Sequence, residues 1–400
     1  MKGSIRKKGD SYYYRIHTST LNIERYAGET RAEANKALRE ALQELETSGM
    51  IFKNVSITFY DLLLEWLASV KPTIKYGTYK DYENVIKNHI SKEDFAKLKV
   101  GMISIHMLQD YINRKCSQYA VSTTKSHFVV LNRALEYAVY PLRYIKESPM
   151  HYVKRPKQTK DDILELLNTN EKKTETITKD EYQSILSKIN PYLQLVFNIS
   201  FYTGARLGEV CSLTWDDIDF DNRQILIKKN LFYNHDLKCW EIGKTKNGRP
   251  RLVDISDKLI AILKEAKKTH LTDRLALGEH YKQKYIKVQT VDTITHLVVT
   301  DEPTDNPMNF VCVQHNGQLI TNQYVKTNIT RNIRKGGEGI DFHFHMLRHT
   351  HATMLIQNGV SMKEVQDRLG HTKITTTMDI YAHTTAASRR QTADVFDALM

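Results

Sequence analysis

The sequence predicts a multidomain α+β protein with a small N-terminal β-sheet plus helix module, an all-α middle domain and a mixed, mainly α last domain. Three observations lead to this class. Residues 11–17 alternate with the period of a strand, and apolar residues recur at helical spacing over 55–153. Both patterns then occur beyond a charge-rich stretch at 154–176. We therefore expect modules at 1–50, 55–153 and 177–400, joined by a linker over 154–176.

The N-terminal module contains the segment SYYYRIH at Ser11–His17, which puts tyrosine and isoleucine on one face of a strand and tyrosine, arginine and histidine on the other. A second short strand is expected at residues 23–27. Thr30 and Glu33 then have the spacing of a capping box that opens a helix. The polar face could lie in a DNA groove, or the basic start of the chain could simply keep the module in solution.

The middle domain shows only helical periodicity. Its first apolar stripe consists of Phe59, Leu62, Leu63, Trp66, Leu67 and Val70. Such a stripe is typical of a helix that packs against a protein core. Lysines between the stripes could follow DNA phosphates or face solvent, and the sequence leaves both interpretations open.

Basic residues dominate the charge balance, with 58 Lys plus Arg against 46 Asp plus Glu and a formal net charge of +12. This surplus favours a polyanionic partner, because basic side chains displace counterions from phosphates. No apolar run is long enough to span a bilayer, and the first residues lack the apolar core of a signal peptide. The four cysteines show no metal-type spacing. We expect a cytoplasmic protein without disulfides, a metal site or a membrane partner.

The segment 343–383 carries the densest set of reactive side chains. His345 and Arg348 are three residues apart, so they share one face of an expected helix that ends at Gly359. A capping box opens the next helix, which is expected to end at Gly370.

His371 then falls on the turn just past that helix, where an imidazole can face a cleft, and Tyr381 follows on another short helix. Two packed helices with surface histidines, or a DNA-reading helix-turn-helix without chemistry, would also fit this pattern. A metal site is a further interpretation, since four histidines crowd together at positions 343, 345, 349 and 351. We do not favour it, because no acidic or cysteine partner completes the ligand set.

A second segment places Arg206 in the first turn of a helix, after a break at Thr203 and Gly204. An arginine is poorly placed there for the helix dipole. It could hold an anion beside the free N–H groups, or form a salt bridge to Glu209 one turn on. Residues 240–255 predict a β-hairpin with a basic turn.

Taken together, these segments resemble the catalytic domain of the tyrosine recombinase, or phage integrase, family over residues 177–385. The family pattern is an arginine in a TGxRxxE segment, a lysine on a β-hairpin, His-x-x-Arg, a Gly-His turn and a tyrosine in a YxH ending. In this chain the pattern falls on Arg206 with Glu209, Lys244, His345 with Arg348, Gly370 with His371, and Tyr381 with His383. The upstream modules are similar to the SAM-like core-binding domain and the arm-type DNA-binding module of integrases from temperate phages and conjugative transposons.

The resemblance implies a site-specific DNA recombinase that cuts and rejoins DNA through a covalent 3′-phosphotyrosine at Tyr381. Two arginines would hold the nonbridging phosphate oxygens, one histidine would accept the phenol proton, a lysine would protonate the leaving 5′ hydroxyl, and a second histidine would hydrogen-bond the transition state. These roles fall on Arg206 and Arg348, His345, Lys244 and His371. Counting back from the second strand favours Lys246 as the acid, so both lysines remain candidates. Rejoining would need no ATP, and no cofactor or metal ion is expected.

The expected partners are double-stranded DNA attachment sites, a homotetramer assembled on DNA, and an excisionase or DNA-bending protein. The family implies integration and excision of a mobile element or prophage in the cytoplasm of a bacterial host. A tail with Val395, Phe396 and Leu399 could pack on a neighbouring protomer or bury itself. Two rival functions stay open: a type IB topoisomerase, and a DNA-binding regulator without catalysis.

Overall fold

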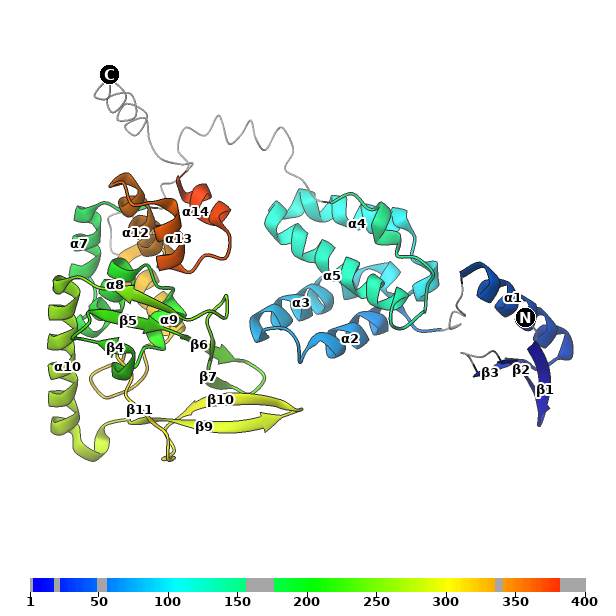
Figure 1. Ribbon diagram of the computed structural model, residues 1–400, viewed down its shortest axis with the longest axis horizontal. Helices are drawn as coiled ribbons and strands as arrows, with labels where there is room; N and C mark the ends of the chain where they lie inside the picture. The colour runs from blue at the N-terminus through cyan, green and yellow to red at the C-terminus, as the bar shows by residue number, and fades with distance from the viewer. Residues whose placement is uncertain (1–2, 18–21, 49–55, 156–175, 335–340, 382–400) are drawn as a thin grey trace, which may run out of the picture. The chain divides into compact units, whose positions relative to one another are not determined.

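The computed structural model describes residues 3–17, 22–48, 56–155, 176–334 and 341–381 (Figure 1). The chain divides into two compact units, Met1–Asn170 and Glu171–Met400, and each is described by itself. Most of the expected linker, residues 156–175, lies outside the described residues.

The N-terminal module is a three-stranded antiparallel sheet in the order β1-β2-β3, followed by one helix. Its elements are β1 (Gly3–Lys8), β2 (Ser11–His17), β3 (Asn22–Gly28) and α1 (Arg31–Ser48). Tyr14 and Ile16 of β2 are buried against Ala41 and Leu45 of α1, as the alternation predicted. Strand β1 was missed, because its basic sequence has few apolar residues to reveal a pattern.

The rest of the first unit is helical, as expected. It consists of α2 (Phe59–Val70), α3 (Tyr76–Asn88), α4 (Ile105–Gln118) and α5 (Val121–Val139), with short 3₁₀ turns at Ile90–Lys92, Asp94–Lys97, Val100–Met102 and Pro149–Tyr152. The predicted stripe of α2 faces a shared core, where Phe59, Leu62 and Leu63 are fully buried.

The second unit is mixed and mainly helical. Its longer helices are α7 (Lys179–Ser187), α8 (Pro191–Thr203), α9 (Leu207–Cys211), α10 (Asp257–Leu277), α11 (Asn322–Asn328), α12 (His345–Gln357), α13 (Met362–Leu369) and α14 (Ile374–Tyr381). Single turns lie at Trp215–Asp217, Gly278–His280 and, as a π-helix, Ile329–Arg334. None of the helices in the described part of the chain is long and apolar enough to cross a membrane.

Two antiparallel sheets accompany these helices, in the orders β4-β5-β8 and β11-β9-β10-β7-β6. The strands are β4 (Ile218–Asp219), β5 (Gln224–Ile227), β6 (Lys229–Asn234), β7 (Cys239–Lys244), β8 (Arg251–Asp254), β9 (Lys284–Val291), β10 (Ile294–Thr300) and β11 (Pro307–Met308). The long β9–β10 hairpin is yellow in Figure 1.

The hairpin predicted for residues 240–255 is wrong. Its first strand, β7, pairs with β6 and β10, whereas its second strand, β8, pairs with β5 in the other sheet. The basic turn therefore crosses from one sheet to the other. A further turn lies at residues 315–317, and an isolated bridge between Val313 and Leu319 pairs its flanks.

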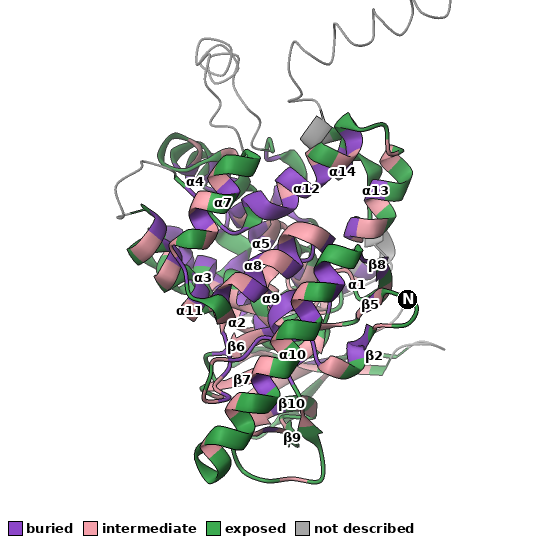
Figure 2. Cartoon of the chain, turned by 90° about the vertical axis from the view of Figure 1, so that its left-hand side faces the viewer, coloured by how far each residue is buried: buried purple, intermediate pink, exposed green. Residues whose placement is uncertain are grey.

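The core of the second unit is built around α8, whose Leu193, Val196 and Phe197 are fully buried. Helices α10 and α12 pack on it, and one long side of α10 stays mostly exposed (Figure 2). A smaller cluster with Ala352 and Leu369 joins α12 to α13. The central helix α8 thus ends beside α12 and α13, where the reactive segments meet.

Candidate active site

The first predicted arginine lies at the start of α9. Helix α8 ends at Gly204, whose φ of 68° turns the chain, and Arg206 follows as the N-cap residue of α9. The Arg206 amide donates to Glu209 Oε2 at 3.0 Å, and its Nη1 donates to Oε1 at 3.1 Å. The salt bridge considered from the sequence therefore forms, and it orients a guanidinium whose side chain is 21% exposed.

Glu209 is almost completely buried and is shared by two arginines. Its Oε2 also accepts a 2.7 Å hydrogen bond from Arg251 Nη2. Burial by itself would raise the pKa of Glu209, but the hydrogen bonds and charges of Arg251 and Arg206 outweigh it and the pKa is lowered. One carboxylate facing two guanidinium groups leaves this corner of the site positive.

Arg348 is the second predicted arginine, and it is 2% exposed on α12. Its Nη1 donates to the Gly204 carbonyl at 2.6 Å and its Nη2 to the Leu369 carbonyl at 2.8 Å. Burial and then the like charge of Arg206 lower the pKa of Arg348 to about 9, so it stays cationic at neutral pH. Among the described residues no carboxylate forms an ion pair with it. A buried cation in this state favours an anion nearby.

Two predicted histidines accompany the arginines. His345 is the first residue of α12 and is exposed, with its ring 4.7 Å from that of His349. His371 lies just after the αL residue Gly370 that ends α13. Desolvation and then neighbouring cationic groups lower the pKa of both imidazoles, that of His371 to about 3. Both imidazoles are therefore uncharged at neutral pH.

The two candidate lysines flank a tight turn. Lys244 is the last residue of β7, and Lys246 lies within the turn closed by the Gly248 amide on the Thr245 carbonyl. Both side chains are exposed. The side-chain amide of Asn247 donates to the carbonyl of Gly370. This turn is thereby attached to the residue that precedes His371.

Tyr381 is the last residue of α14, and its side chain lies outside what the structure describes, as does His383. Helix α14 packs against α12 and α13. Its buried Thr377 lies with Oγ1 3.0 Å from Nδ1 of His371. The backbone that carries the tyrosine is thus attached to the histidine turn of the site.

Two residues of this region, Arg251 and Arg368, were not singled out from the sequence, and His351 was considered there only as a candidate metal ligand. Arg368 donates from Nε to His351 Nε2 at 3.0 Å and from Nη2 to the Tyr202 carbonyl at 3.1 Å. Arg251 donates from Nε to the Arg368 carbonyl at 2.9 Å. The sequence held one indication of the position of Arg251. Side chains alternate along a strand, so Arg251 falls on the same face as the buried Val253.

The described residues contain no group of three or more His, Cys, Asp or Glu arranged to hold a metal ion. Of the four histidines crowded in the sequence, His343 is exposed, and His351 is turned to the Phe201 carbonyl at 2.8 Å. His343 and His351 therefore lie in different surroundings.

Two models of known protein families match parts of this chain. The model of the phage integrase family matches residues 175–388, and that of the phage integrase N-terminal SAM-like domain matches residues 58–116. The chain belongs to the phage integrase family. As a tyrosine recombinase it is an enzyme of site-specific DNA recombination.

Relatives of this integrase match along most of its length. A tyrosine recombinase XerC-like protein of Caldanaerobacter subterraneus subsp. tengcongensis is 27% identical and covers 96% of this chain and 95% of its own. The ICEBs1 integrase of Bacillus subtilis is 25% identical and covers 93% and 91%.

Solved structures show the same fold. The Tn1549 transposon integrase in complex with transposon right end DNA matches with a TM-score of 0.63 at 19% identity, covering 85% of this chain and all of that one. A lambda integrase tetramer bound to a Holliday junction matches with a TM-score of 0.51 at 17% identity, covering 94% of each chain. The predicted fold class is thereby confirmed.

Proposed function

We propose that this integrase binds a scissile DNA phosphate between Arg206 and Arg348 and attacks it with Tyr381. The observation that carries the proposal is the attachment of both arginines to one turn: Arg348 donates to the carbonyl of Gly204, two residues before Arg206. Two fixed guanidinium groups with one shared carboxylate nearby suit the nonbridging oxygens of a phosphodiester, because each can bind them with two parallel donors.

The proposed reaction balances without an outside energy source. The Tyr381 oxygen forms a bond to phosphorus while the bond from phosphorus to the 5′ oxygen breaks. The phenol has an ordinary pKa near 10, so its proton needs an acceptor, and neutral His345 is our candidate. The 5′ hydroxyl of a partner strand then attacks the phosphotyrosine and restores both the phosphodiester and the tyrosine.

The leaving 5′ oxygen needs a proton, which we assign to the turn between β7 and β8. The segment pattern pointed to Lys244. Lys246 lies inside the turn that Asn247 attaches to Gly370, and this attachment favours Lys246 over Lys244. His371, next to Gly370, would donate to the same phosphate oxygens as they gain charge.

We also propose that the N-terminal sheet is an arm-type DNA-binding surface. Its face away from α1 carries Arg6, Tyr13 and Tyr26 in one cross-strand row. Tyr26 is 56% exposed, and the Lys8 ammonium lies 5.1 Å from the Tyr13 ring. A twisted three-stranded sheet with aromatic and basic side chains on one face can enter a groove and contact phosphates. Residues 55–153 and 177–400 would then form the core-binding and catalytic domains, joined by the linker 154–176.

The assembly proposed on DNA is a homotetramer that joins two attachment sites; the structure of a lambda integrase tetramer bound to a Holliday junction supports this oligomeric state. An excisionase or DNA-bending protein would assist excision. The proposed place of action is the cytoplasm of a bacterial host.

A nicked suicide duplex covering one end of the mobile element that carries the gene tests the chemistry. The nick lets the cleaved fragment diffuse away, so the covalent complex should accumulate with the wild-type protein. It should disappear in Tyr381→Phe, which should still shift the duplex on a native gel. An adduct of unchanged yield in Tyr381→Phe would refute the proposal. Relaxation of plasmids that lack the element's ends would favour a topoisomerase instead.

A further inference from the structure

We infer that Arg251 is a positioning residue for strand cleavage, which locks the carboxylate beside Arg206 to the turn that carries His371. This inference rests on the proposed function, since it concerns how the proposed site residues are held.

Arg251 lies inside the second unit although it is charged. It is the first residue of β8, where it pairs with Ile227 of β5. Its side chain is 9% exposed, and it shares its strand face with Val253, which is 1% exposed. A guanidinium at such a position must have its N–H groups satisfied by the protein.

Two separate parts of the site satisfy it. Arg251 Nη2 donates to Glu209 Oε2 at 2.7 Å, and Nε donates to the carbonyl of Arg368 at 2.9 Å. Glu209 belongs to α9, and Arg368 belongs to the last turn of α13, which leads directly to His371. One planar group therefore fixes the distance between these two elements.

The turn itself fits closely around this side chain. Gly370 has a φ of 67°, and a Cβ at this position would lie 3.1 Å from Cδ and 3.2 Å from Nη1 of Arg251. The Arg251 side chain thus passes directly beside the Gly370 backbone. The Asn247 amide holds the carbonyl of the same glycine, so the connection between β7 and β8 supports the His371 turn at two points.

The charge of Arg251 leaves donors of Arg206 available to a phosphate, because both arginines share the Glu209 carboxylate. Glu209 is 1% exposed, and its contact with Arg206 Nη1 occupies one of the five N–H groups of that guanidinium. Without Arg251 the buried carboxylate would have Arg206 as its remaining cation. The Glu209 carboxylate would then accept hydrogen bonds from further N–H groups of Arg206, as in a bidentate arginine–carboxylate pair. Those donors would be lost to the phosphate.

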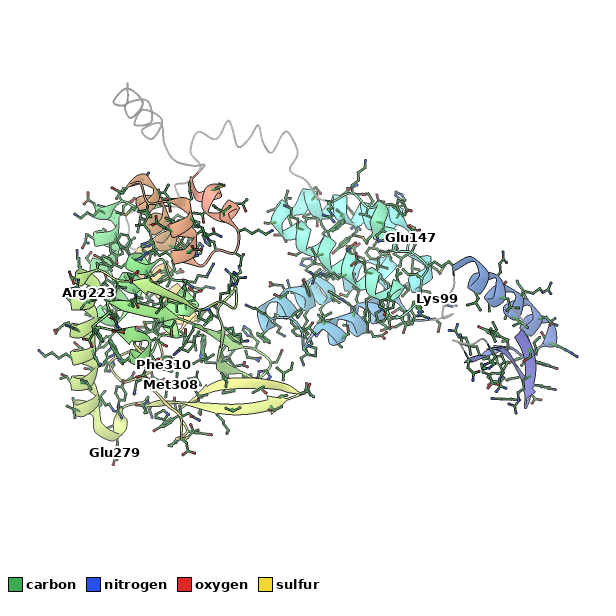
Figure 3. All side chains as sticks on the ribbon, viewed as in Figure 1. Lys99, Glu147, Arg223, Glu279, Met308 and Phe310 are labelled. Atoms are coloured by element: carbon green, nitrogen blue, oxygen red, sulfur yellow. The ribbon has the colours of Figure 1, made fainter. Side chains whose placement is uncertain are left out.

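The consequence is a defect in the cleavage step and not in DNA binding. We therefore compare Arg251→Gln with Arg223→Gln as a matched control. Arg223 (labelled in Figure 3) lies in the same sheet region but forms an exposed 2.8 Å ion pair with Asp257. The measurements are the single-turnover rate of adduct formation on the nicked duplex at saturating protein, and the affinity for that duplex.

Arg251→Gln should lower the cleavage rate about 10- to 100-fold, the range expected when a catalytic group is misplaced by about 1 Å. Its DNA affinity should stay at the wild-type value, and Arg223→Gln should change neither quantity. In Arg251→Gln the pKa of Glu209 loses its largest lowering contribution, so the acid limb of the rate profile should move to higher pH. A purely structural role would not move this limb.

A double-mutant comparison shows whether Arg251 acts through Glu209. The loss in Arg251→Gln/Glu209→Gln should be smaller than the product of the two single losses. If Arg251→Gln does not fold, Arg251→Lys decides, because lysine keeps the charge but does not reproduce the planar two-partner contact. Arg251→Lys should cleave more slowly than the wild type, and the acid limb of its profile of cleavage rate against pH should stay at the wild-type position.

A wild-type protein that forms the adduct, with Arg251→Gln or Arg251→Lys equally fast, would overturn this inference and leave the proposed function standing. Multiplicative losses in the double variant would overturn it as well. No adduct from the wild type itself would refute the proposed function, and the inference with it.

Discussion

Arg348 donates a 2.6 Å hydrogen bond to the carbonyl of Gly204. This bond joins the helix of one proposed phosphate ligand to the turn that leads into the other. The second bond of Arg348, to the Leu369 carbonyl, extends the connection to the end of α13. The relative placement of the two guanidinium groups is therefore a property of the folded catalytic unit and does not depend on DNA to create it.

Arg348→Lys should lower both stability and cleavage. Lysine keeps the charge but cannot reproduce the two in-plane donors, so one buried carbonyl loses its partner at a cost of about 1–3 kcal/mol in the free energy of unfolding. Chemical denaturation and the suicide-substrate assay measure the two effects. Arg334→Lys is the control, since Arg334 also donates to a carbonyl, that of Phe342, but is 43% exposed. Equal behaviour of the two variants would contradict this description of Arg348.

Gly204→Ala should destabilise the protein more than Gly359→Ala. Both glycines have positive φ, 68° and 83°, so both variants carry the backbone cost of roughly 1–2 kcal/mol. Only at Gly204 would a methyl group overlap Leu369 and approach the His351 ring to 2.9 Å, while nothing lies within 4 Å at Gly359. Overpacking should add about 1–3 kcal/mol. Equal shifts in the denaturation midpoint would show that this turn is not tightly packed against α13.

Acid should destabilise the catalytic unit through His351. Burial, and then the charge of Arg368, lower its pKa to about 4 in the folded protein, whereas the unfolded value is near 6.5. The unfolded chain therefore binds the proton first, and stability falls as pH drops from about 6.5 towards 4, by roughly 3 kcal/mol at most.

His351→Gln should make this part of the curve of stability against pH less steep, measured by thermal melting of the full chain, while His345 and His371 keep their own contributions to it. The exposed His280 of the same unit supplies the control variant, His280→Gln, which should leave the curve unchanged. If His351→Gln keeps the full slope, the acid sensitivity arises elsewhere.

The identity of the general acid can be read from a modified substrate. A 5′-bridging sulfur makes the leaving group a thiolate, which departs without a proton. Lys246→Ala should therefore cleave normal DNA slowly and the sulfur-substituted DNA at the wild-type rate, whereas Lys244→Ala should show no such rescue. Rescue in Lys244→Ala alone would assign the acid to the end of β7.

The N-terminal sheet should contribute to affinity through phosphates. Arg15→Ala removes a cation from the face that carries Tyr13, and should reduce the slope of log affinity against log salt by about 1 for arm-site DNA. Arg39→Ala removes the same charge from the exposed side of α1 and should leave the slope unchanged. A reduced slope in both variants would indicate a diffuse effect of net charge instead of a defined surface.

Local patterns predicted most of the fold. The predicted capping boxes of Thr30 with Glu33 and of Ser361 with Glu364 both form, and the apolar stripe of α2 is buried. Pairing between distant strands could not be predicted, because Arg251 and Ile227 become neighbours only when β5 and β8 form one sheet. That is why residues 240–255 were assigned to one hairpin and in fact belong to two sheets.

The candidate site was predicted where side-chain chemistry repeats a known spacing, as with His345 and Arg348. The supporting residues Arg251 and Arg368 could not be found this way. They act through backbone carbonyls that lie on other elements, and a carbonyl is present at every position of a sequence. Only the folded structure shows which carbonyls accept no hydrogen bond within a helix or a sheet and so need another donor.

Digestion of the covalent complex, followed by mass spectrometry of the DNA-linked peptide, tests the central claim most directly. We predict a single phosphotyrosyl linkage at Tyr381 with the DNA attached through its 3′ end. A linkage at any other residue, or through a 5′ phosphate, would contradict it.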